Sequence, residues 1–214
     1  MHDTEGWKSL ETSMRIMQNI IEAIGTHLYN FELDRILKCV RQGVDHINRF
    51  VREISYFVIN AVFVASARIF DEAEQSAHQD KFVAFCADLV PVVAQGLGDN
   101  WSQVRYASSQ AVRGYYAIAK GRPELREKYD ALLVPRMCLN RYYVAEGVKI
   151  YSNETWRMVH ETEGRQAICK YAKEVCEFYV SQSEADNHAV REAACHCIAE
   201  LCTKVALEVD REPF

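Results

Sequence analysis

The residues best suited to chemistry lie close together near the end of the chain, in the stretch DNHAVREAACHCIAELC, residues 186–202. Five of them are of types that bind zinc: His188, Cys195, His196, Cys197 and Cys202. A structural zinc site needs four such ligands in a tetrahedral arrangement. The stretch has helical spacing and no helix breaker, so Cys195 and Cys197 would lie about 200° apart around the helix axis. Since no CxxC or HxxxH pair completes a ligand set, we expect no metal here.

Two further patterns could indicate an enzyme, and neither is complete. His160-Glu161 is a His-Glu dyad, but a two-metal site built from such dyads needs several of them, and the chain has one. The stretch GLGDN, residues 96–100, resembles a phosphate-binding glycine loop, but it follows a predicted helix, whereas that fingerprint follows a strand. No serine or cysteine has a histidine at a recognisable motif spacing. We therefore expect a non-catalytic protein without a cofactor.

The composition favours an intracellular helical protein. Of the 214 residues, 49% are hydrophobic and only four are proline and nine glycine, which suits helices. The opening MHDTEGWKSLE is polar and acidic, unlike a signal peptide, and no uncharged apolar run reaches the ~18 residues of a membrane span. We therefore predict the cytoplasm, with the nucleus as the alternative compartment, and no membrane partner. The eight cysteines are expected to be reduced and to pack as small hydrophobic residues.

A repeat becomes visible when the valine of a Val-Arg pair is used as its anchor. The four anchoring pairs are separated by 53, 44 and 42 residues: Val51-Arg52, Val104-Arg105, Val148-Lys149 and Val190-Arg191. Positions 0, +4, +8 and +11 of each copy carry a valine, a small residue and two apolar residues. The four stripes are Val51, Ser55, Ile59, Val62; Val104, Ser108, Val112, Tyr115; Val148, Ser152, Trp156, Val159; and Val190, Ala194, Ile198, Leu201.

Each stripe predicts the buried face of an amphipathic helix, and its small residue allows a second helix to approach closely. His196 occupies a position that the other copies fill with Phe57, Gln110 and Glu154. The repeat therefore does not reserve this position for a zinc ligand. The histidines and cysteines of residues 186–202 are therefore interpreted as one copy of a structural repeat, in which Asp186 or Asn187 caps the helix.

A second helix is predicted ahead of each stripe. Pro91 and Pro135 both lie thirteen residues before the following anchor valine, a fixed place at which proline kinks a helix. Asp99 follows Pro91 by eight residues and is expected to cap the next helix or to pair with Arg105.

These features resemble the HEAT-repeat family, in which a kinked first helix with a proline, a turn with an aspartate and a second helix opening with Val-Arg form one unit. The third copy departs from the pattern, since Tyr143 stands in the aspartate slot. The resemblance implies an all-α fold: one α-solenoid domain, residues 1–214, of about four HEAT-like helix pairs preceded by one extra helix. The expected repeats are about 5–25 (partial), 31–70, 80–120, 123–161 and 164–208.

Within those repeats the helix pairs are expected at 31–45 with 47–70, 80–97 with 100–120, 123–142 with 145–161, and 164–182 with 187–208. An acidic loop, DEAEQSAHQD, is expected over residues 71–80. Solenoids carry capping repeats at both ends, whereas this sequence starts within a predicted repeat. Whether it is a piece of a longer repeat protein is left open.

The resemblance implies a scaffold that binds other proteins on its concave surface or through its turns, without selecting among transport receptors, phosphatase or ligase scaffolds and assembly factors. Tyrosine, tryptophan and arginine are enriched in binding hot spots, and the turns carry them here. The candidate partner-binding residues are Asp99, Asn100, Trp101, Arg136, Asn140, Arg141, Tyr142, Tyr143, Asp186, Asn187 and His188. The alternative for Trp101 and the tyrosines is that they cover edges of the core.

Charge distribution suggests an acidic partner and leaves nucleic acid as the second candidate. The whole chain has a net charge of −5, but residues 101–157 carry 10 basic and 5 acidic side chains. Basic and aromatic residues together can hold phosphates and stack bases. Against this, Arg105 and Lys149 occupy the slot that the family resemblance gives to a structural arginine. We therefore expect an acidic protein segment as the partner and do not favour nucleic acid.

Overall fold

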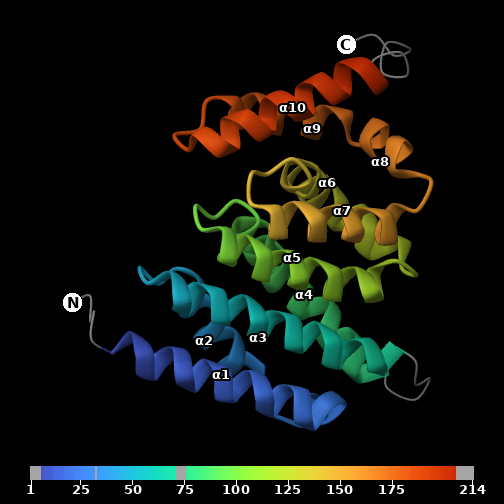
Figure 1. Ribbon diagram of the computed structural model, residues 1–214. Coiled ribbons are helices and arrows are strands. Elements are labelled where there is room, and N and C mark those ends of the chain that lie inside the picture. The colour runs from blue at the N-terminus through green and yellow to red at the C-terminus, as the bar shows by residue number, and fades with distance from the viewer. Residues whose placement is uncertain (1–5, 32, 71–75, 206–214) are drawn as a thin grey trace. The chain divides into compact units, whose positions relative to one another are not determined.

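The computed structural model describes residues 6–31, 33–70 and 76–205, and these form helices joined by short turns, with no strand among them (Figure 1). The predicted all-α class is therefore confirmed. Contacts divide the chain into two compact units, Met1–Arg122 and Pro123–Phe214, which we call unit 1 and unit 2. Each is described by itself, and the single solenoid expected for residues 1–214 stays a prediction.

Unit 1 has two layers of helices. Its elements are α1 (Trp7–Ile24), η1 (Gly25–Asn30, a 3₁₀ helix), α2 (Leu33–Val44), α3 (Arg49–Ala67), η2 (Arg68–Phe70, 3₁₀), α4 (Ser76–Gly96) and α5 (Ser102–Ala119). Helices α1, α3 and α5 lie side by side, with α3 in the middle, and α2 and α4 pack behind them (Figure 1). The second helices of successive predicted repeats thus form one layer and the first helices form the other.

Small residues set how closely the two layers approach, as the repeat predicted. The stripe residues of α3 and α5 are all buried. Ser55 faces Gly43 of α2, where an added Cβ would overlap the serine hydroxyl. Ser108 of α5 donates a hydrogen bond to the Val93 carbonyl of α4 at 2.6 Å. A larger side chain at either serine would therefore push the helices apart.

The arginine that follows each anchor valine binds the turn before its own helix. Arg52 donates to the carbonyls of His46 and Ile47, both at 3.0 Å. Arg105, which is buried, donates to the carbonyls of Asp99 at 2.6 Å and Leu97 at 2.9 Å. These carbonyls lie at or just beyond the end of the preceding helix, where no intrahelical donor reaches them.

Asp99 links two predicted repeats. Its carboxylate accepts from the Trp101 backbone N–H at 2.8 Å, which closes the turn before α5. The predicted cap was wrong, because the N-cap position of α5 is Trp101 and no side chain caps this helix. The ion pair, however, is made with Arg52, at 2.8 and 3.1 Å, and not with Arg105 through the carboxylate. The expected pairing was wrong because Arg105 turns inward to the carbonyls and leaves the Asp99 carboxylate to the arginine of the preceding copy.

Unit 2 contains α6 (Pro123–Asn140), α7 (Glu146–His160), α8 (Gly164–Lys170), α9 (Ala172–Ser183) and α10 (His188–Lys204). Helix α9 packs on α10 and α6, and α6 also contacts α7 and α10. Arg191 of α10 repeats the arginine bonds of unit 1, donating to the carbonyls of Ala185 and Asp186 at 2.7 and 2.8 Å. In the fourth stripe Val190 and Ala194 are buried, whereas Ile198 and Leu201 are half-buried.

The structure corrects two element boundaries. The helix expected over 164–182 is divided at Tyr171, whose non-helical backbone (φ −113°, ψ 32°) accompanies a buried ring. The acidic loop expected over 71–80 was too long, since α4 already begins at Ser76; residues 71–75 lie outside the described part. A run of charged and polar residues without glycine or proline suits the first turn of a helix as well as a loop.

Among the residues that the structure describes, one segment, Arg49–Phe70, is long and apolar enough to cross a membrane by length and composition, with a mean hydropathy of 1.4 in its most apolar window. Inside the fold 61% of that window is buried, as in a core helix that other helices surround. The expectation of no membrane partner stays a prediction.

Candidate functional site

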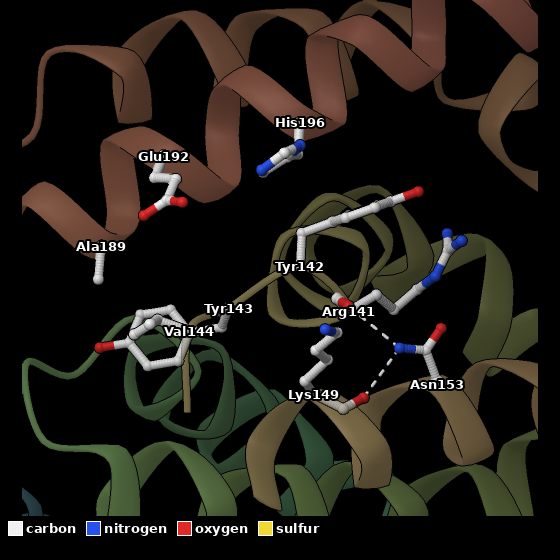
Figure 2. Close-up of a pocket in the computed structure, with 9 residues that line it drawn as sticks. All are labelled: Arg141, Tyr142, Tyr143, Val144, Lys149, Asn153, Ala189, Glu192 and His196. Carbon is white, nitrogen blue, oxygen red and sulfur yellow. Dashed lines mark hydrogen bonds between the residues drawn. The ribbon is translucent and has the colours of Figure 1, made fainter. Parts of the chain in front are cut away.

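Unit 2 holds a cavity of about 550 Å³ between the α6–α7 turn, the first half of α7 and the first half of α10 (Figure 2). Its lining residues are Arg141, Tyr142, Tyr143, Val144, Lys149, Asn153, Ala189, Glu192 and His196. A smaller cavity of about 230 Å³ shares Arg141 and reaches the other ends of α7 and α10; its remaining lining residues are Trp156, Glu161, Thr162, Gly164, Arg165, Ile168, Glu200, Lys204 and Val205. We call the two cavities together the α7–α10 site.

Hydrogen bonds hold the turn and α10 in place around the larger cavity. Asn153 donates from its amide nitrogen to the carbonyl of Arg141 at 3.0 Å and to that of Lys149 at 2.9 Å, which ties α7 to the turn (Figure 2). Asn187 caps α10 by accepting from the Ala189 N–H at 3.0 Å, as the sequence predicted. The α6–α7 turn is therefore fixed to α7 by bonds from a side chain to the backbone, and the start of α10 is capped.

Arg141 stands at the boundary of the two cavities and is only partly satisfied. Its side chain is 13% exposed, and one terminal nitrogen lies 3.3 Å from Glu200 Oε1. Its guanidinium carbon is 4.9 Å from the centre of the Trp156 ring, within cation–π range. The other terminal nitrogen contacts only the Cys138 sulfur, at 4.0 Å, and Nε finds no hydrogen-bond partner among the described residues. A buried guanidinium with five donors thus retains unused hydrogen-bonding capacity.

Glu200 is the acidic partner inside the site. It lies 3.3 Å from Arg141 and also 3.3 Å from the Lys204 amine. Burial raises the pKa of its carboxyl, but the charge of Arg141 and hydrogen bonds from Tyr142 and Lys204 outweigh burial, so the pKa lies below its ordinary value. Burial followed by the bond to Glu200 raises the pKa of Tyr142, whose ring stacks on His196 at 6.0 Å. The carboxylate is therefore charged at neutral pH.

The structure brings only some of the predicted partner-binding residues to this site. Arg141 and Tyr142 line it with part of their surface exposed, and Tyr143 lines it although nearly all of its surface is buried. Asn140 is fully buried, and Arg136 lies half-buried, with its guanidinium carbon 4.7 Å from the Phe178 ring centre. These two residues serve packing in unit 2, because the end of α6 is inside the fold.

The remaining predicted residues lie elsewhere. Asp186 and His188 are exposed beside the larger cavity without lining it, and Asn187 is the helix cap described above. The turn with Asp99, Asn100 and Trp101 belongs to unit 1, where Asn100 is exposed and the Trp101 ring lies under the Arg49 guanidinium at 3.9 Å. The Asp99 carboxylate is committed to Arg52 and to the Trp101 N–H, so this turn offers fewer free groups than predicted.

Several lining residues were not among the predicted ones: Val144, Lys149, Asn153, Ala189, Glu192, His196 and Glu200. Two sequence signals could have indicated some of them. The third copy of the repeat has lysine in the arginine slot and Tyr143 in the aspartate slot, and both residues line the site. Ala189, Glu192 and His196 also share one face of α10 at helical spacing.

Several basic residues of segment 101–157 are buried or engaged within their own unit. Arg105 is buried, Arg126 pairs with Asp130 at 3.0 Å, and Arg122 lies 3.8 Å from the centre of the Phe70 ring. Arg136 and Arg141 are engaged inside unit 2, as described above. The exposed basic residues of the segment are Lys120, Lys128, Lys149 and Arg157, and Lys149 lies 3.9 Å from Glu146.

In the part of the chain that the structure describes, no three His, Cys, Asp or Glu residues are arranged to hold a metal ion, and the eight cysteines are unpaired with one another. His160 ends α7 as expected but is buried, with its ring centre 4.1 Å from that of Trp156. Burial and the charges of Arg126 and Arg141 lower the pKa of His160 to about 3. Burial raises the pKa of the Cys138 thiol to about 11, so it is not a ready nucleophile.

Comparison with known proteins adds no relative: no family model matches the chain, and no curated protein matches it either. The resemblance to HEAT repeats therefore stays a prediction that rests on the residues and contacts described above.

Proposed function

We propose that the chain is a HEAT-like α-solenoid scaffold without catalytic activity, and that it binds a segment of a partner protein in the α7–α10 site. The side-by-side layer of α1, α3 and α5 in unit 1, with α2 and α4 behind it, supports the repeat assignment. So do the bonds of Arg52, Arg105 and Arg191 to the turns before their own helices.

The observation that carries the proposal is the 550 Å³ cavity, bordered by Arg141 and Tyr142, two residue types typical of binding hot spots. Val144 stands at its rim with 64% of its surface exposed, an apolar side chain suited to contact a partner. The stacked pair of Tyr142 and His196 forms a flat aromatic wall (Figure 2). A cavity that combines apolar, aromatic and charged walls is typical of a site for a peptide or loop.

The test fills the cavity without touching the core. Replacing the half-buried Ala189 by tryptophan should block the larger cavity, whereas Ala199→Trp places the same side chain at an exposed position on the same helix outside it. Both variants and the parent are used as bait in cell extract, and captured proteins are identified by mass spectrometry. We expect a partner that the parent and Ala199→Trp retain and Ala189→Trp loses. Equal capture by all three would contradict the proposal.

No observation favours the second candidate, nucleic acid. Of the arginines expected in its basic surface, Arg105 is buried, Arg122 and Arg136 lie on aromatic rings, and Arg126 and Arg141 pair with carboxylates.

A further inference from the structure

The charges around Arg141 indicate what kind of group the α7–α10 site receives. Among its lining residues are four basic side chains, Arg141, Lys149, Arg165 and Lys204, and three acidic ones, Glu161, Glu192 and Glu200. The site therefore has a net charge of +1 within a chain of net charge −5. Without Glu200 its basic residues would outnumber the acidic ones by two.

Arg141 and Glu200 form an incomplete pair. An arginine and a carboxylate can make two parallel, short hydrogen bonds. Here a single contact of 3.3 Å joins them, and Arg141 Nε has no hydrogen-bond partner among the described residues. Glu200 has an alternative partner in Lys204, on the next turn of the same helix at 3.3 Å. Glu200 can thus leave Arg141 without losing all compensation for its charge.

We propose that the α7–α10 site recognises a carboxylate side chain of an acidic peptide segment, held between Arg141 and Lys149, and that Glu200 is the internal carboxylate which this side chain displaces. The inference rests on the proposed function and specifies the chemistry of the partner. Lys149 is suited to the role because it is exposed, faces the larger cavity and has its closest carboxylate, Glu146, at 3.9 Å (Figure 2).

The displacement gives Glu200 and the two basic residues opposite effects on binding. Arg141 and Lys149 attract the ligand carboxylate, so weakening either lowers affinity. Glu200 competes with the ligand for Arg141, so making it neutral removes the competitor and raises affinity. A residue with a merely structural role would lower affinity, or leave it unchanged, when replaced.

The probe is a fluorescein-labelled peptide of alternating glutamate and alanine, and its control has glutamine in place of glutamate. Binding is measured by fluorescence polarisation to the full chain and to three variants: Lys149→Glu, Arg141→Lys and Glu200→Gln. Lys173→Glu and Glu177→Gln are the matched controls, since both positions are exposed on α9 and do not line the site. Circular dichroism in urea checks that each variant is folded.

We expect the glutamate peptide to bind at least about tenfold more tightly than the glutamine peptide, with Lys149→Glu and Arg141→Lys each about tenfold weaker. Glu200→Gln should bind severalfold more tightly, and the two control variants should match the parent. Equal binding of the two peptides, no measurable binding of the glutamate peptide, or unchanged or weaker binding by folded Glu200→Gln would overturn the inference.

Two comparisons separate this inference from the proposed function. If Ala189→Trp loses a captured partner but the glutamate peptide does not compete with that partner, the site binds protein and the carboxylate inference fails. A labelled single-stranded oligonucleotide that binds more tightly than the glutamate peptide at physiological salt would overturn both and favour nucleic acid.

Discussion

At the scale of single residues, the position after the anchor valine is structural in three copies of the repeat and lines the proposed site in the remaining one. The arginines at 52, 105 and 191 hold the turns before their helices through carbonyl bonds. Lysine has no planar group with several donors to reach those carbonyls together, so Lys149 in the same slot is exposed and lines the α7–α10 site. A structural role for this arginine slot was expected from the resemblance to HEAT repeats, whereas the carbonyls that the arginines bind were not. The pairing of Arg141 with Glu200 could not be predicted, because 59 residues separate them and no local pattern relates them.

Asp99→Ala should destabilise unit 1 by about 1–3 kcal/mol, because it removes both the hydrogen bond to the Trp101 N–H in the turn before α5 and the ion pair with Arg52. Both side chains of that pair are mostly buried, at 15% and 14% exposed. Asp88→Ala is the control: its pair with Arg41 is 38% and 53% exposed, and its loss should cost about 1 kcal/mol or less. Urea unfolding measures the free energy of unfolding of both variants. Equal losses in the two would show that the Asp99 interactions stabilise unit 1 no more than the exposed Asp88–Arg41 pair does.

His160 should make unit 2 sensitive to acid. Its pKa is about 3 in the folded protein against about 6.5 in the unfolded chain, so between these values only the unfolded state binds the proton. Stability from this group is therefore lost as pH falls below about 6.5. Between about pH 7 and 5 the parent should lose roughly 1–2 kcal/mol more free energy of unfolding than His160→Gln. If the free energies of unfolding of the parent and of His160→Gln changed in parallel with pH, His160 would not be buried in its neutral form.

At the scale of helices, periodicity predicts which face of a helix is buried. It does not predict a break in the helix that accompanies the burial of a single side chain. The stripes of α3 and α5 are buried as expected, and their serines meet glycine or backbone of the first helices. The break at Tyr171 was not predictable, since the residues around it continue a helical pattern and the ring is buried only in the assembled unit. Helix α4 began earlier than predicted because its polar first turn resembles a loop in composition.

Ser108→Leu should cost about 1–3 kcal/mol, because the larger side chain has no room beside Val93 and the serine hydrogen bond to its carbonyl is lost. Ala194→Leu tests the equivalent position of α10, which is also fully buried. Gln103→Leu makes an exposed leucine on α5 and should change stability by less than about 0.5 kcal/mol. If Ser108→Leu and Gln103→Leu had the same urea midpoint, the stripe would not be the buried face of α5.

At the scale of the whole molecule, the repeat accounts for features inside each of the two units. It relates α1, α3 and α5 to one another, and it relates the arginine of α10 to those of unit 1. The α7–α10 site arises where the third copy departs from the pattern, at Tyr143 and Lys149. A repeat pattern describes what its copies share, and a binding site depends on how they differ, so the fold was predictable to a greater extent than the site.

The solenoid itself can be tested by small-angle X-ray scattering. A compact globule of 214 residues has a radius of gyration of about 17 Å. Stacked repeats extend in one direction, so the proposed solenoid should give a clearly larger value and a distance distribution with a long tail. A value at or below that of the globule, measured on monomeric protein, would contradict it.

The central claim is that a partner protein is bound at the α7–α10 site, and site-specific photo-crosslinking tests it most directly. A photo-reactive amino acid is placed at Val144, on the rim of the larger cavity, or at Val180, on α9 outside the site; these valines are 64% and 59% exposed. After irradiation in cell extract, we predict a discrete crosslinked partner from position 144 that is absent from position 180 and disappears with Ala189→Trp. The same crosslinked partner from both positions, or from position 180 alone, would contradict the account.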